Sequence, residues 1–166
     1  MLIRRDTPAD TEAIGRLITE AFATARRSSG HEAAIVAALR ASDALTLSLV
    51  AEDQGKIIGY VAFSPIVVDD AMVSWFGLGP VSVLPPRQRQ GIGVALIERG
   101  LSNLRDASAK GCVVLGDPNY YGKFGFRNDP GLRYGETGIH FQRLVFVDPV
   151  PKGEVRYHIA FDVGRV

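Results

Sequence analysis

Apolar residues recur along this chain at two spacings, one typical of helices and the other of strands. The helical spacing predicts a helix that starts at the capping sequence Thr7-Pro8-Ala9-Asp10 and a second helix from Glu32 to about Arg40. The strand spacing predicts a short first strand at 2–5, a hairpin with strands at 47–52 and 56–65, and a turn at Asp69-Asp70. A long fourth strand is expected to begin at Met72.

The stretch from Leu78 to Leu104 combines a strand, a basic turn and an amphipathic helix. Residues up to Val83 are mostly small or apolar, as in a buried strand, and the helix is expected from Gln90 to about Ser108. The apolar run at 112–115 predicts a central strand that a helical crossover makes parallel to the fourth strand. Two closing antiparallel strands are expected at 139–147 and 155–161.

The turn before the helix has the chemistry of an anion site. Backbone N–H groups from Gln88 to Gly93 would lie in or before the first helical turn, where they have no intrahelical partner and where the helix dipole favours negative charge. Gly91 and Gly93 let an anion approach the backbone, and Arg87 and Arg89 add positive charge. We therefore expect a pyrophosphate here. The sequence has no Walker triplet, and the dinucleotide fingerprint lacks its third glycine.

Two motifs resemble those of the GNAT superfamily of N-acetyltransferases. Gln88-x-x-Gly91-x-Gly93 matches the pyrophosphate loop of that family, Gln/Arg-x-x-Gly-x-Gly/Ala. Further along, the family pattern Tyr-x-Lys/Arg-x-Gly-Phe is matched by Tyr121, Lys123, Gly125 and Phe126. The surrounding Gly-Asp-Pro-x-Tyr-Tyr sequence is similar to the YhbS-like branch of small acetyltransferases, and the resemblance covers nearly the whole chain.

The resemblance implies an α+β fold with mixed α/β character. It implies a central, mostly antiparallel mixed sheet of about seven strands, with strands four and five parallel and splayed and with helices on both faces. Residues 1–166 would form a single N-acetyltransferase domain.

The resemblance also implies a set of site residues and no metal. Acetyl-CoA would be the cofactor, Asn119 would contact it, and Tyr121 would be the catalytic proton donor or an orienting hydrogen bond. Backbone groups of the fourth strand would hold the pantetheine arm and polarise the thioester carbonyl. The remaining cofactor-binding positions are Val81, Ser82, Val83, Gln88, Arg89, Gln90, Gly91, Ile92 and Gly93.

The sequence departs from the family pattern in two places. Many family members carry a glutamate base in the middle of the fourth strand, but residues 74–79 contain no carboxylate. Glu20, Asp117 and Glu136 are candidate bases without a ranking. Val114 occupies the usual place of a cofactor-binding asparagine, for which Asn119 would substitute.

Composition narrows the range of partners. A net charge of +1 over 166 residues gives no electrostatic reason to expect nucleic acid or a membrane surface. The lone Cys112 suits a reducing cytoplasm, the N-terminus has no targeting pattern, and no apolar run is long enough to span a membrane. Homodimerisation is common in the family, and the loop with Arg26, Arg27 and His31 often borders the acceptor site there.

We therefore expect an acetyl-CoA-dependent N-acetyltransferase that transfers the acetyl group directly to a primary amine in a ternary complex. A catalytically silent acyl-CoA-binding sensor or scaffold is the alternative, motivated by the missing acid. A toxin-type enzyme that acetylates charged tRNA would need a basic surface, which the balanced charge disfavours. The acceptor stays open among small polyamines, amino acids, antibiotics and protein N-termini.

Overall fold

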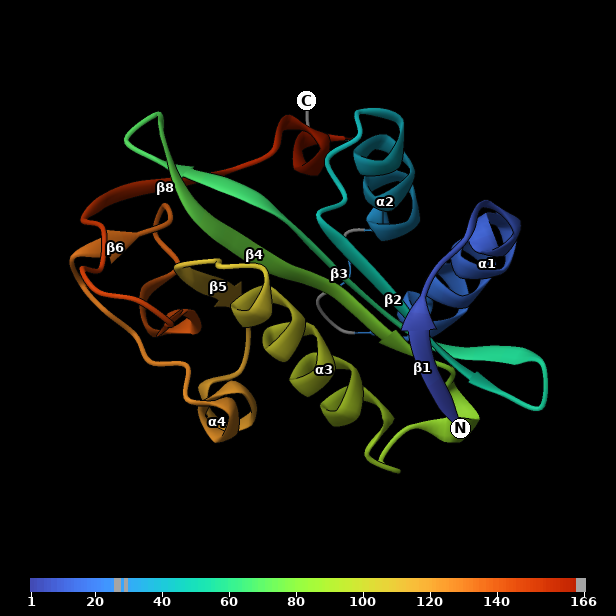
Figure 1. Ribbon diagram of the computed structural model, residues 1–166. Coiled ribbons are helices and arrows are strands. Elements are labelled where there is room, and N and C mark those ends of the chain that lie inside the picture. Colours follow the sequence, from blue (N-terminus) through green and yellow to red (C-terminus); the bar gives the residue numbers. More distant parts are fainter. Residues whose placement is uncertain (26–27, 29, 164–166) are drawn as a thin grey trace.

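A computed structural model describes residues 1–25, 28 and 30–163, so Arg26 and Arg27 lie outside the described residues. The chain forms one mixed sheet in the order β1-β2-β3-β4-β5-β7, with β8 paired to β3 and the two-residue β6 paired to β8 (Figure 1). Only β4–β5 and β6–β8 are parallel pairs among the described strands. The predicted α+β fold, with its central mixed sheet and parallel fourth and fifth strands, is confirmed.

The first four strands form antiparallel pairs in chain order. They are β1 (Leu2–Arg5), β2 (Leu47–Asp53), β3 (Lys56–Val68) and β4 (Ala71–Val83). Asp69 and Asp70 both have positive φ, at 48° and 63°, as a tight hairpin turn requires. The hairpin and the turn that the sequence predicted are therefore present.

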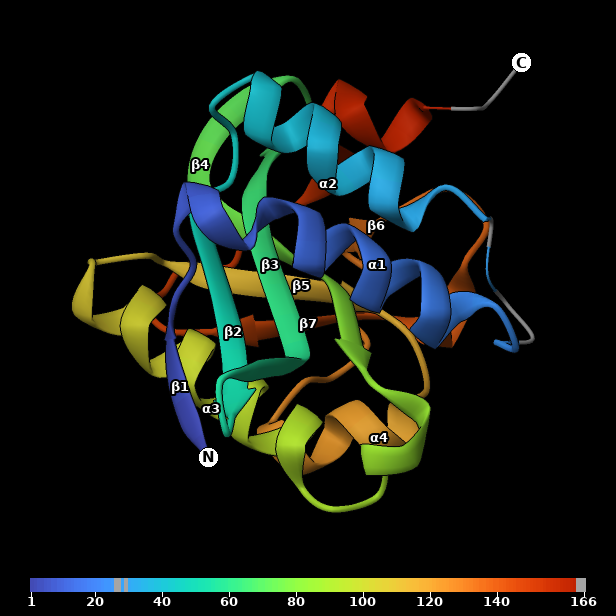
Figure 2. The same cartoon turned by 90° about the vertical axis from the view of Figure 1, so that its right-hand side faces the viewer.

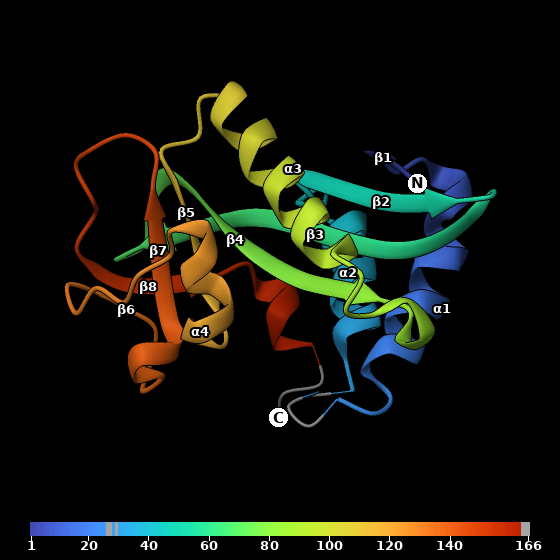
Figure 3. The ribbon, with the colours of Figure 1, turned by 90° about the horizontal axis from the view of Figure 1, so that it is seen from below.

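Helices cover both faces of the sheet. After the 3₁₀ turn η1 (Pro8–Asp10), α1 (Thr11–Phe22) and α2 (Glu32–Ala41) lie over one face (Figure 2). The crossover helix α3 (Ile92–Asp106) lies over the other face, as the view from below shows (Figure 3). The expected apolar stripe on α3 is buried at Ile97, Leu101 and Leu104, with Leu96 beside them in place of Val94, which is only half-buried. None of the described helices is long and apolar enough to cross a membrane.

The closing strands differ from the prediction. β7 (Phe141–Val145) pairs with β5 (Gly111–Leu115), whereas β8 (Gly153–Tyr157) pairs with β3, so the two strands are not neighbours. The chain leaves the sheet after Tyr157 because the His158 ring nitrogen accepts a hydrogen bond from the Ala160 N–H and caps the turn η5 (Ile159–Asp162). Ala160 then packs beside α2.

The fourth strand parts from the fifth in the middle of the sheet. Parallel pairing joins only Trp75, Phe76 and Gly77 to β5, while β4 continues to Val83 (Figure 1). Val61 pairs with Val81, but Phe63 pairs with Leu78, so β4 carries one extra residue opposite β3. Such a bulge bends a strand and increases its twist. The splay between strands four and five is thus a property of this chain.

Close packing of α3 on the sheet gives a prediction about stability. A Cβ on Gly100 would overlap the Phe63 ring, whereas a Cβ on Gly15 of α1 has no atom within 4 Å. Gly100→Ala should destabilise the fold by about 1–3 kcal/mol through overpacking. Gly15→Ala, the matched control, should stabilise it by about 1 kcal/mol through helix propensity. Urea denaturation of both variants measures the difference, and equal effects would contradict this packing.

Candidate active site

The loop before α3 forms a curled backbone with free N–H groups. Arg89 and Gly91 both adopt left-handed conformations, with φ of 63° and 82°, and alternation of this kind turns successive N–H groups to one side. The first intrahelical bond runs from the Ala95 N–H to the Gly91 oxygen at 3.0 Å, so the N–H groups of Ile92 and Gly93 have no helical acceptor. The Gln88 N–H instead donates to the Pro85 oxygen at 3.3 Å. The backbone N–H groups without an acceptor in this loop therefore begin after Gln88.

A cavity of about 420 Å³ opens in front of this loop. Two cations line it without a hydrogen-bonded or ion-paired partner among the described residues: Arg89 and Lys123. The third cation, Arg87, forms an ion pair with Asp53 at 3.0 Å and donates to the Gln90 side chain at 3.2 Å. Six of the predicted cofactor residues line the cavity, namely Val83, Gln88, Arg89, Gly91, Ile92 and Gly93.

Two lining residues that the sequence analysis did not single out for binding are Tyr120 and Lys123. They lie on α4 (Pro118–Tyr121) and on the following turn η3 (Gly122–Phe124). The Tyr120 hydroxyl would be 3.4 Å from a Cβ on Gly93, and the Lys123 ammonium lies 4.2 Å from the centroid of the Tyr120 ring. This cation–π contact holds the Lys123 ammonium over the Tyr120 ring, beside the cavity that the loop lines.

The end of β4 presents backbone groups toward the gap beside β5. The Leu84 N–H donates to the Ile58 oxygen at 3.0 Å, which makes Gly59 and Val83 a non-hydrogen-bonded pair. By alternation, Val81 and Val83 turn their N–H and C=O groups away from β3, whereas Ser82 turns its groups toward β3. The Val83 oxygen accepts a hydrogen bond from the Gln88 side chain at 3.0 Å.

Tyr121 lies beside the end of β5. Its ring packs against Gly116 so closely that a Cβ there would overlap it, and it meets the Phe126 ring at 6.0 Å between centroids. Burial raises the pKa of the Tyr121 phenol to about 12, with smaller contributions from Tyr120 and Cys112. The phenol is therefore protonated throughout the neutral range and can donate a hydrogen bond.

The remaining predicted residues lie outside the cavity. Asn119 is exposed on α4, where its backbone N–H donates to the capping Asp117 carboxylate at 2.9 Å. Gln90 is also exposed. Among the candidate bases, Asp117 has that capping role and Glu20 is exposed on α1. Glu136 lines a separate cavity on the far side of β5. In the described part of the chain, no group of three His, Cys, Asp or Glu side chains could hold a metal ion.

Comparison with known proteins decides the family. The model of the acetyltransferase (GNAT) domain matches residues 44–128. The uncharacterized N-acetyltransferase YhbS of Escherichia coli strain K12 is 36% identical over 170 residues, which cover 98% of this chain and 99% of YhbS. The chain belongs to the GNAT family of acetyltransferases. The family that the two motifs predicted is confirmed.

Two solved GNAT structures are similar over almost the whole chain. A GNAT acetyltransferase from Brucella melitensis, solved in complex with acetyl-CoA, has 48% identity and a TM-score of 0.89 over 97% of both chains. YhbS from Escherichia coli in complex with CoA has 36% identity and a TM-score of 0.89, covering 97% of this chain and 91% of that one.

The role of the α3 loop in CoA binding can be tested by placing a charged side chain at Gly93. At this position φ is not strained and a side chain has room. Gly93→Asp should weaken CoA binding about a hundredfold or more, because the carboxylate would face the pyrophosphate. Gly93→Asn is the matched control of equal size and should lose much less. Calorimetric titration with CoA measures both, and equal losses would mean that bulk decides binding.

A second test concerns Lys123. Lys123→Met should weaken CoA binding by about tenfold, because a charge-assisted contact to a phosphate is lost. Lys56→Met removes a lysine from an exposed site at the start of β3 and should leave the affinity unchanged. Titration at two salt concentrations separates the variants further, since the Lys123 effect should shrink at high salt. Equal affinities of the two variants would exclude Lys123 from the site.

Proposed function

We propose that this chain is an acetyl-CoA-dependent N-acetyltransferase that transfers the acetyl group directly to a primary amine in a ternary complex. One observation carries the proposal: the free N–H groups of the α3 loop line a cavity that reaches Val83 at the end of β4, beyond the point where β4 parts from β5. That two similar GNAT enzymes were solved with acetyl-CoA or CoA supports it.

The residues present fit a CoA thioester. Gly91 and Gly93 leave space for a pyrophosphate in front of the N–H groups, and Arg89 and Lys123 supply the opposing charge. The amide-bearing arm of CoA would find donors and acceptors at Val81 and Val83. Acetyl-CoA, when bound, supplies the activated acyl group.

Three residue groups then act on the reaction. A backbone N–H of the β4 edge can donate to the thioester carbonyl as negative charge develops there during attack. The Tyr121 hydroxyl can donate a hydrogen bond or a proton toward the departing sulfur. Because Ser74–Gly79 carry no carboxylate, we assign deprotonation of the acceptor ammonium to water in the open cavity on the far side of the sheet.

The role of Tyr121 predicts how a conservative variant behaves. Tyr121→Phe should lower kcat by about a hundredfold while the Kd for CoA changes little, because the hydroxyl acts only as the sulfur departs. With the pKa of this phenol near 12, the wild-type rate should show no decline near pH 10, where an ordinary tyrosine ionises. Steady-state kinetics and a CoA titration test this together.

Two outcomes of that experiment would speak against parts of the proposal, and a third would support it. Equal losses of kcat and CoA affinity would reduce Tyr121 to a packing residue. Binding of CoA without acetyl transfer to any amine would favour the silent acyl-CoA-binding module, which the missing β4 carboxylate motivates. An inactive Tyr121→Phe with normal CoA affinity would support proton donation.

A further inference from the structure

A second tyrosine, Tyr157, lies where β4 and β5 part, on the face of the sheet away from α3. Gly77 is the last β4 residue paired with β5, and a Cβ on Gly77 would be 2.6 Å from the Tyr157 ring. The residues paired with Gly77 show on which face of the sheet Tyr157 lies. Phe63 points toward Gly100 of α3, so the next residue, Ser64, points the other way, and Ser64 is paired directly with Gly77.

Tyr121 and Tyr157 therefore flank the gap from opposite sides. Tyr121 packs with Gly116 and Phe126 on the α3 side. Tyr157 belongs to the smaller apolar cluster around Trp75 on the far side. Burial raises the pKa of Tyr157 well above its ordinary value, with smaller contributions from Cys112, Tyr134 and Tyr121. Both phenols are neutral at physiological pH.

The Tyr157 hydroxyl has no hydrogen-bond partner among the described residues. Nearby, the Ser64 hydroxyl is fully buried and also lacks a partner. Buried hydroxyl groups in proteins are almost always hydrogen-bonded. The buried Ser64 hydroxyl and the half-buried Tyr157 side chain lie on one face where the strands part, and together they mark a place for a polar group from outside the chain.

A row of aromatic rings leads away from this point. Tyr157 lies 5.0 Å from the Tyr134 ring and 5.1 Å from the Phe161 ring, measured between centroids. All three rings line a cavity of about 560 Å³, together with Leu115 at the end of β5. Rings in this arrangement offer flat apolar surfaces, and their faces also attract ammonium groups.

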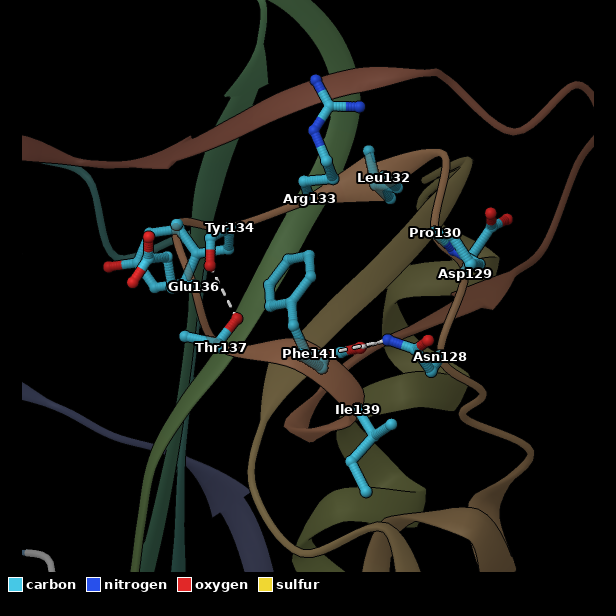
Figure 4. A pocket seen from close by; sticks show the side chains of 12 residues that line it. Asn128, Asp129, Pro130, Leu132, Arg133, Tyr134, Glu136, Thr137, Ile139 and Phe141 are labelled. Carbon is cyan, nitrogen blue, oxygen red and sulfur yellow. Dashed lines mark hydrogen bonds between the residues drawn. The ribbon is translucent and has the colours of Figure 1, made fainter.

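A second chamber of about 420 Å³ lies beside the first, and the two share Tyr134, Gly135 and Thr137. Figure 4 shows this chamber, with the Phe141 ring near its centre and 5.5 Å from the Tyr134 ring. The Glu136 side chain lines it and has no hydrogen-bond or ion-pair partner among the described residues. The arginines near the two chambers are paired, Arg133 with Glu154 at 3.6 Å and Arg156 with Asp70 at 3.3 Å. Glu136 is thus an uncompensated negative charge among the described residues that line the chambers.

We propose that Tyr157 contacts the reacting amine, and that the rings of Tyr157, Tyr134 and Phe161 select a primary amine with an aromatic or branched apolar body. The proposal rests on the proposed function and names its acceptor class. The Tyr157 oxygen accepts one N–H of the neutral amine, so that the nitrogen lone pair points toward the gap where Tyr121 lies. The rings hold the body of the acceptor, and the acidic surroundings attract its ammonium form from solution.

The first experiment compares acceptors by thiol release from acetyl-CoA. Phenethylamine should be acetylated with a kcat/KM about tenfold or more above that of spermidine or glucosamine, which lack an apolar body. Binding is measured separately by titrating phenethylamine into the protein saturated with CoA. Preference for spermidine or glucosamine, or no binding of phenethylamine to the CoA complex, would overturn the acceptor class.

The second experiment removes one hydroxyl. Tyr157→Phe should lower kcat/KM for phenethylamine by about tenfold and weaken phenethylamine binding, while the Kd for CoA stays the same. Tyr60→Phe is the matched control, because the Tyr60 hydroxyl is buried against Ser48 at 2.7 Å and lines neither cavity. It should leave both constants unchanged. Identical behaviour of the two variants would overturn the role of Tyr157.

The two proposals fail in different ways. If the protein does not bind CoA, the proposed function fails and the acceptor proposal fails with it. If it binds CoA and acetylates an amine that the ring row disfavours, only the acceptor proposal fails.

Discussion

The separation of β4 from β5 is the constraint on which the rest of this structure depends. β4 keeps its pairing with β3 through an extra residue between Leu78 and Val81, and it loses β5 after Gly77. Backbone groups at Val81 and Val83 are thereby left without a strand partner. Such groups cost free energy unless water, a side chain or a ligand satisfies them. Gln88 satisfies one, the Val83 oxygen, and the others remain available to a ligand.

The groups that we assign to CoA and those that we assign to the acceptor lie on opposite faces of the sheet, on either side of the gap. On the α3 side, the curled loop, Arg89 and Lys123 line a cavity with positive charge, and Tyr121 is the proton donor that we propose. On the other side, Tyr157 and its neighbouring rings border a roomier cavity. Tyr157 packs against Gly77, where β4 leaves β5, and Tyr121 packs against Gly116, just after β5 ends.

The sequence predicted the parts of the site that depend on the spacing of residues close together in the chain. The loop from Gln88 to Gly93 follows from glycine positions before an amphipathic helix, and the parallel pairing of β4 and β5 follows from the handedness of one crossover. Tyr121 was predicted as a site residue because its motif is contiguous in the sequence, and its role stays a prediction. The resemblance to the GNAT family supplied the splay, which no local pattern contains.

Residues fixed by distant packing could not be predicted in the same way. Tyr120 and Tyr121 are neighbours on a short helix, and nothing in the sequence says which one faces the loop and which one faces the gap. Tyr157 reaches Gly77 only because β8 pairs with β3, whereas the pattern of the last strands suggested a simpler closing pair. Asn119 was assigned by analogy with a family position, and it is exposed here because Asp117 caps a helix of only one turn.

The central claim is that CoA binds along the α3 loop and the free edge of β4. Backbone amide NMR during titration with CoA tests it most directly, because each N–H group reports separately. The account predicts large shifts at Val81, Val83 and Ile92–Gly93, and little change at Ser82, whose N–H faces β3. Binding that leaves these amides unperturbed, or perturbs Ser82 as strongly as Val81 and Val83, would contradict it.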